Sequence, residues 1–131
     1  MTTDGYLRYP HVRGDQLTFV AENDVWLAET GGGRAYRLTS DHDPVLSPRI
    51  SPDGTTVAWV ARRHGAGEVY VAPTDGGVSR RLTYWGAANT QVTGWVSDDE
   101  VLVLSSAGES DLVRMFAHAV PVDGGPSRRL P

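Results

Sequence analysis

The sequence predicts an all-β fold built from short strands, and two observations carry that prediction. The 131 residues include 15 glycines and 8 prolines, together about 18% of the chain against roughly 12% in average proteins. So many turn-forming residues leave little room for long helices. The second observation is an internal repeat, in which similar segments recur along the chain at intervals of 44 and 48 residues.

Three copies of the repeat end on an arginine–leucine motif and carry a turn segment, glycine-rich in each copy, seven residues before that motif. The motifs lie at residues 37–39, 81–83 and 129–131, and the turns at residues 30–33, 74–77 and 122–125. A period of roughly 40–45 residues with four strands per unit is the signature of a β-propeller blade. We therefore predict one partial propeller over residues 1–131, with blades at about 6–41, 45–85 and 89–131.

The four strands of each blade follow in order from the residue pattern. Strand A is a short apolar stretch that ends near Val12, Ile50 or Val96, and a tight turn follows it, clearest at residues 51–54, which read Ser-Pro-Asp-Gly. Strand B is rich in β-branched and aromatic residues. It lies within residues 14–21, 54–61 and 98–105.

Strand C is predicted at residues 24–28, 68–72 and 116–120, and strand D carries the arginine motifs. In the third copy a helix is the alternative, because Leu112, Met115, Phe116 and Ala119 have helical spacing. The following Pro-x-Asp-Gly-Gly segment matches the second copy in register, and this match favours the strand.

Length differences between the copies place the insertions in the B–C hairpins. Because those hairpins and the D–A connections open on the same side of a blade, we expect one variable face, the typical binding side of a repeat protein. This face, called the loop face below, comprises hairpin residues 62–67 and 106–115 and connection residues 40–47 and 84–91.

Composition excludes several functional classes. The chain has no cysteine and a net charge of −4, so we expect no thiol chemistry and neither nucleic acid nor a membrane as partner. The N-terminus has no secretion signal and no apolar run is long enough to span a bilayer, which predicts a cytoplasmic protein. No nucleophile elbow or dinucleotide motif occurs. We therefore predict no catalytic residues, no cofactor and no metal, and interpret residues 41–43 as a solvated loop.

Several segments resemble the start of tricorn protease homologues from actinobacteria: residues 52–54, 80–86, 89–95 and 117–125. The Pro-Asp-Gly turn alone is shared with TolB-like and prolyl-oligopeptidase-type propellers, whereas residues 82–95 are the specific part. The resemblance implies the first half of a six-bladed N-terminal propeller in a hexameric, cytoplasmic serine peptidase. In that family the first propeller lines a passage and helps to position peptide ends.

Four residues of the loop face are the candidate peptide contacts. Arg62 and Arg63 can hold a carboxylate by bidentate hydrogen bonds, although a solvated pair is the simpler interpretation. The family can carry carboxylate-binding arginines in the loop after the Leu-Thr-Tyr motif. Here residues 86–91 hold none, so only weak polar contacts from Asn89 and Gln91 are predicted.

Three functions are therefore open. The first is a non-catalytic propeller segment of a tricorn-like serine peptidase, which contributes to peptide passage and assembly. Because propellers close with four to eight blades, its partners would be peptides and the remaining domains of the same protein. The second is a stand-alone binding module whose six-bladed ring is completed by a second copy. The third is a TolB-like or prolyl-oligopeptidase-type propeller.

Overall fold

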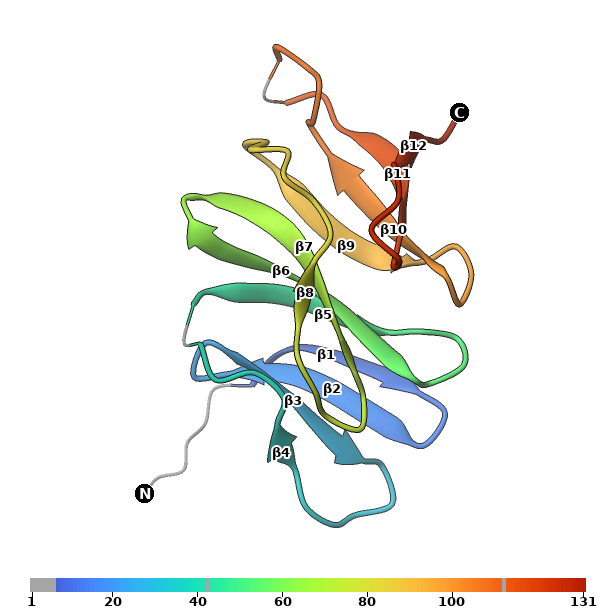
Figure 1. Ribbon diagram of the computed structural model, residues 1–131. Helices are drawn as coiled ribbons and strands as arrows, with labels where there is room; N and C mark the ends of the chain where they lie inside the picture. Colours follow the sequence, from blue (N-terminus) through green and yellow to red (C-terminus); the bar gives the residue numbers. More distant parts are fainter. Residues whose placement is uncertain (1–6, 42, 112) are drawn as a thin grey trace.

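The computed structural model describes residues 7–41, 43–111 and 113–131, and in that part of the chain twelve strands form three four-stranded antiparallel sheets (Figure 1). The first blade comprises β1 (Arg8–Arg13), β2 (Gln16–Ala21), β3 (Asp24–Glu29) and β4 (Tyr36–Arg37). The second comprises β5 (Val45–Ile50), β6 (Thr56–His64), β7 (Ala66–Pro73) and β8 (Arg80–Arg81). The third comprises β9 (Thr90–Trp95), β10 (Glu100–Ser105), β11 (Phe116–Pro121) and β12 (Arg128–Arg129). The predicted all-β blade architecture is confirmed.

The helical alternative for the third strand C is wrong. β11 pairs with β10 along its whole length, from Glu100 opposite Pro121 to Ser105 opposite Phe116. The ladder with β10 satisfies the backbone of this segment and brings its side chains beside those of β10. Leu112 lies outside the described residues. The described part of the chain contains no helix that is long and apolar enough to cross a membrane.

The B–C hairpins differ in length, as the insertions predict. In the first blade, β2 and β3 are joined by Glu22 and Asn23, both with positive φ (53° and 63°). This is the two-residue hairpin turn whose twist matches the strands. In the second blade the hairpin runs on until His64 pairs with Ala66 around Gly65, which has φ 94°.

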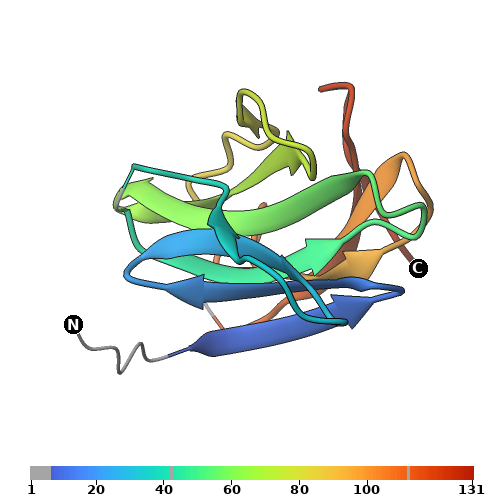
Figure 2. The same cartoon turned by 90° about the horizontal axis from the view of Figure 1, so that it is seen from below.

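The blades stack face to face (Figures 1 and 2), and apolar side chains fill the space between neighbouring sheets. Between the first and second blades, Trp59 is fully buried and stacks on Tyr70, with ring centroids 6.3 Å apart. Val60, the next residue of β6, is equally buried on the opposite face, against the third blade. The central sheet is therefore covered on both sides only by its neighbours.

The two outer faces of the stack repeat the same surfaces without a neighbour. Phe19 and Trp26 stack at 6.4 Å in the first blade, at the register positions of Trp59 and Tyr70, yet Trp26 is only half-buried. On the third blade, Leu102 and Leu104 are half-buried, although their counterparts in the second blade are buried. Both faces are apolar surfaces of the kind that other blades cover.

Strands β1, β5 and β9 form one edge of the stack, where each contacts the next. We call this edge the hub edge, because the first strands of the blades surround the central channel of a propeller. Pro10 in β1 and Pro48 in β5 remove backbone donors from it. Proline on an edge strand discourages pairing with a further strand, so the hub edge is protected against the addition of another strand.

Replacing Trp59 tests the interblade packing. Trp59→Ala removes a large, fully buried side chain, and we expect the free energy of unfolding to fall by about 3–5 kcal/mol in urea denaturation. Val78→Ala, at a position that is 85% exposed, is the control and should change it by less than about 0.5 kcal/mol. If Trp59→Ala cannot be purified folded, Trp59→Phe should show a smaller loss. Equal stability of Trp59→Phe and Val78→Ala would contradict the packing role.

Candidate functional site

The structure gathers the hairpins and connections of the loop face on one side of the stack. The backbone N–H of Arg62, in the second hairpin, donates to the carbonyl oxygen of Pro44 at 3.0 Å. In the third blade, the N–H of Ser106 donates to the carbonyl oxygen of Asn89 at 3.0 Å. In the second and third blades the B–C hairpin is thus tied by backbone to the connection that enters its own blade.

Arg63 is the most constrained of the four predicted peptide contacts. Its guanidinium forms ion pairs with Asp41 and, from Nε at 3.2 Å, with Asp43, and it lies 4.6 Å from the ring centroid of Tyr70. The carboxylates of the loop therefore hold an arginine. Among the described residues no cluster of metal-binding side chains occurs, and His42 lies outside them.

The other three predicted contacts lie at the surface. Arg62, Asn89 and Gln91 are exposed. Asn89 follows the second blade, and Gln91 is the second residue of β9. The main-chain oxygen of Asn89 also accepts from the hydroxyl of Ser105 at 3.1 Å, so the backbone of this connection is fixed. Gln91 lies opposite Leu104 in the register of β9 and β10, so it stands where the loop face meets the outer face of the third blade.

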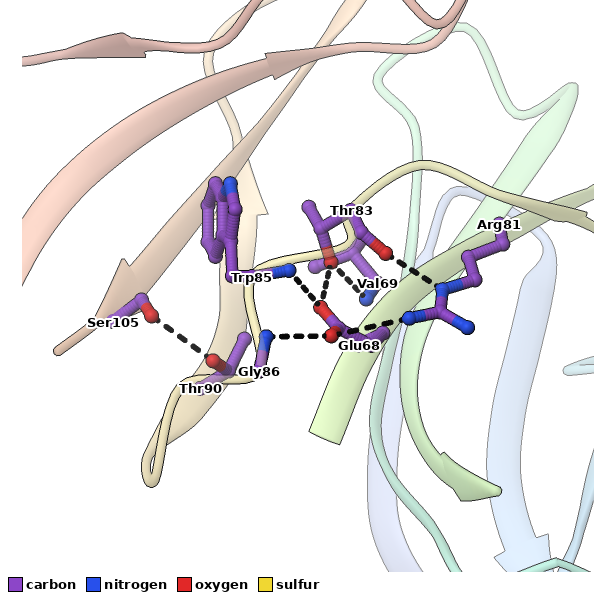
Figure 3. Close-up of polar contacts among 8 residues, drawn as sticks. All are labelled: Glu68, Val69, Arg81, Thr83, Trp85, Gly86, Thr90 and Ser105. Atoms are coloured by element: carbon purple, nitrogen blue, oxygen red, sulfur yellow. Dashed lines mark hydrogen bonds and ion pairs between the residues drawn. The ribbon is translucent and has the colours of Figure 1, made fainter. Parts of the chain in front are cut away.

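Sequence analysis missed the centre of the site, Glu68 at the start of strand C, which is 4% exposed. Figure 3 shows its carboxylate surrounded by donors. Oε1 accepts from the Thr83 hydroxyl at 2.6 Å and from the Trp85 N–H at 3.1 Å. Oε2 accepts from the Gly86 N–H at 2.9 Å and from Arg81 at 3.3 Å. Glu68 thereby anchors the connection to the third blade.

The surroundings of Glu68 keep it ionised. Burial by itself raises the pKa of this carboxyl group, because a low-dielectric site disfavours charge. Hydrogen bonds from Thr83, Gly86 and Trp85, with the attraction of Arg81, outweigh burial and lower the pKa below its usual value. The Thr83 hydroxyl also accepts from the Val69 N–H at 2.9 Å, which fixes its proton toward Glu68.

The first blade contains the same arrangement and the third does not. Thr39 donates to Asp24 at 2.7 Å, and Arg37 lies 3.6 Å from the same carboxylate. In the third blade Phe116 replaces the acid, and the Arg129 guanidinium lies 3.1 Å from its ring centroid. An acidic residue at the start of strand C recurs at the 44-residue interval, as does the threonine that donates to it, and this recurrence is the sequence signal that would have revealed Glu68.

Beside Glu68 the loop face is hollowed into a pocket of about 190 Å³, lined among others by Arg63, Tyr70, Arg81 and Tyr84. Arg81 lies 4.0 Å from the ring centroid of Tyr84, which is 73% exposed. Arg63 is paired with Asp41 and Asp43, and Arg81 is paired with Glu68. The pocket walls therefore present aromatic rings and guanidinium groups whose charge is already balanced.

Comparisons with known proteins decide the family. Residues 4–131 match the family model of the tricorn protease N-terminal beta propeller domain. The chain belongs to this family. Tricorn protease homolog 1 of Streptomyces coelicolor is 56% identical over 126 residues, which are 96% of this chain and 12% of that protein. The chain thus spans about an eighth of the length of this relative.

Solved structures agree with the tricorn propeller fold. The crystal structure of the tricorn protease matches with a TM-score of 0.82 and 22% identity, covering 92% of this chain and 13% of that one. A putative TolB from Agrobacterium tumefaciens matches with a TM-score of 0.77 and 21% identity, covering 98% of this chain and 47% of that one. At these identities the likeness shows the blade fold alone, so the TolB-like alternative shares the architecture.

Replacing Glu68 tests the anchor. In Glu68→Gln the amide group brings a donor toward the Gly86 N–H and Arg81, which are donors themselves. We expect a loss of about 1–3 kcal/mol in the free energy of unfolding at pH 7, measured in urea. Glu22→Gln, which alters an exposed ion pair with Arg37, should cost less than about 1 kcal/mol. Equal effects of the two changes would contradict the anchor.

The lowered pKa of Glu68 also predicts a pH dependence. A carboxyl whose pKa is lower in the folded than in the unfolded chain adds stability above the unfolded pKa, and loses it as pH falls. The usual value is 4.5, so this contribution should disappear progressively below about pH 4.5. Urea denaturation between pH 6 and pH 3 should show a shallower pH dependence in Glu68→Gln than in the parent chain. Parallel curves would contradict the assignment.

Proposed function

We propose that this chain is a non-catalytic propeller segment of a tricorn-type serine peptidase, contributing to peptide passage and positioning and to assembly. The family match over residues 4–131 carries the proposal. The sequence also lacks the Gly-x-Ser-x-Gly nucleophile elbow of many serine hydrolases. A cytoplasmic location, which the sequence resemblance implies, is part of the proposal.

Assembly is supported by the outer faces of the stack. Half-buried Trp26, which stacks on the buried Phe19, on one side, and half-buried Leu102 and Leu104 on the other, lie at positions equivalent to those buried between blades. We assign further blades of the same protein as the partners that cover both faces, because propellers require more than three blades to close.

Peptide positioning is assigned to the loop face. Arg62, Asn89 and Gln91 offer exposed polar side chains there, and Arg63 offers the edge of a guanidinium that Asp41 and Asp43 hold in place. The remaining N–H groups of Arg63 suit the carbonyl oxygens of a peptide, and the exposed guanidinium of Arg62 suits a peptide carboxylate.

A binding and hydrolysis assay tests this role. Incubated with fluorescently labelled peptides, the chain should bind them without cleaving them, and Arg62→Gln combined with Gln91→Ala should weaken binding about tenfold. Arg34→Gln, a change at an exposed position remote from the loop face, is the charge-matched control and should bind as the parent does. Hydrolysis that a serine-directed inhibitor stops would overturn the non-catalytic assignment. Equal binding by all variants would overturn the assigned contacts.

A stand-alone module completed by a second copy is the other candidate, favoured by one observation. The chain carries both complementary outer faces, so the third blade of one copy can cover the first blade of another in a closed pair. The molar mass in solution separates the two candidates. A discrete dimer that unfolds cooperatively, and that Trp26→Glu dissociates, would favour the paired ring. A monomer, or undefined aggregates, would favour the peptidase segment.

A further inference from the structure

The hub edge presents basic side chains at matched positions of two blades. His11 in β1 lies opposite Thr18, and Arg49 in β5 lies opposite Ala58. Thr18 and Ala58 are at the same position of strand B, so His11 and Arg49 are repeat equivalents on neighbouring strands. Arg13 follows at the end of β1. All three side chains are half-buried.

A backbone irregularity directly precedes both equivalent positions. Tyr9 and Ser47, each followed by proline, have φ 52°, a region that residues other than glycine rarely adopt. In both strands the pairing register shifts at this point. Bulges of this kind redirect the side chains that follow and are frequent beside functional sites. In each of the two strands a strained residue therefore lies two positions before the basic residue, His11 or Arg49.

The charges of the hub edge are not neutralised within the described part of the chain. Ion pairs to carboxylates occupy other arginines, namely Arg37, Arg63, Arg81, Arg128 and Arg129. Among the described residues neither Arg13 nor Arg49 has a carboxylate at ion-pairing distance. The Nε atom of Arg13 is buried without a hydrogen-bond partner. Arg49 donates from Nη1 to the carbonyl oxygen of Pro48 at 3.0 Å, a contact that leaves its charge without a counter-ion. Partly buried arginines in this state are suited to an anionic ligand.

The imidazole of His11 is oriented as a donor. The Ile50 N–H donates to its Nδ1 atom at 3.2 Å, so the neutral ring carries its proton on Nε2. Burial, followed by the charges of Arg49 and Arg13, lowers the pKa of His11. At neutral pH the ring therefore keeps the hydrogen bond between the blades and leaves Nε2–H to donate to a ligand.

The third inner strand carries no side chain at the equivalent position. Gly94 of β9 occupies the position equivalent to His11 and Arg49, opposite Leu102. A Cβ atom at Gly94 would meet nothing within 4 Å. The indole N–H of Trp95 donates to the carbonyl oxygen of Arg49 at 3.0 Å, which fixes the backbone from which the arginine extends.

We propose that His11, Arg13 and Arg49 form an anion-binding site on the hub edge that takes a carboxylate group. Guanidinium groups bind carboxylates through charge-assisted, often bidentate hydrogen bonds, and the imidazole N–H adds a third donor. This inference rests on the proposed function for its ligand: acidic side chains of peptides that pass the hub edge. The site is separate from the loop face and its four candidate contacts.

NMR of the histidine ring protons tests the site on the whole chain, with His11→Gln used to assign the signal of His11. The first probe is a peptide with blocked ends that carries two glutamates, and its control is the same peptide with glutamines. Acetate is the second probe, and it separates a free carboxylate from a peptide side chain. The glutamate peptide should shift the His11 signal and raise the pKa of His11, because a bound anion favours the imidazolium form.

Matched variants locate the effect. Arg49→Gln and Arg13→Gln should each weaken binding of the glutamate peptide about tenfold, whereas Arg34→Gln, with the same change in net charge, should not. Equal weakening by Arg34→Gln, or equal shifts by the glutamine peptide, would overturn the site. If Arg62→Gln alone weakens binding, peptides bind on the loop face, and the inference fails while the proposed function stands. If acetate binds in an Arg49-dependent way and no peptide binds anywhere, the anion site stands and peptide positioning fails.

Discussion

The structure depends on one constraint, which is that a blade has two apolar faces and can cover neither from within. Consecutive residues of β6 show this directly, because Trp59 and Val60 point to opposite sides and both are fully buried. Only neighbouring blades can exclude water from such a sheet. The central blade meets this requirement in the described chain, and the two flanking blades meet it on one side each.

The polar network of the loop face is coupled to this packing. Glu68 accepts hydrogen bonds from the backbone of the connection that leads to the third blade. Trp85 in that connection packs on the apolar side chains between the second and third blades, and its ring centroid lies 5.0 Å from that of His118. The Glu68 carboxylate fixes the connection between the second and third blades. The shape of the loop face therefore depends on how the sheets are arranged as well as on the sequence of its loops.

Much of the fold could be predicted from the sequence because the repeat identified the strands and the B–C insertions, while the segment at residues 82–95 carried the family resemblance. The ion pairs of Arg63 could not, because they join side chains about twenty residues apart whose approach depends on blade geometry. The positive φ at Tyr9 and Ser47 was equally hidden, since neither residue type favours it. Glu68 could have been predicted by comparing the repeats, because an acidic residue and a threonine recur together at the 44-residue interval. One copy of the repeat alone does not show which carboxylate is buried.

The pairing order of the strands bears on how the chain acquires its structure. Within each described sheet, every strand pairs with the one that precedes or follows it in sequence. Local pairing keeps the entropy of loop closure small and shortens the search for native contacts. The hairpins of each blade can therefore begin to pair soon after their own residues leave the ribosome, but a sheet becomes stable only when a neighbouring blade covers it. Because that contact between blades stabilises each sheet, folding and assembly in this architecture are governed by the same surfaces.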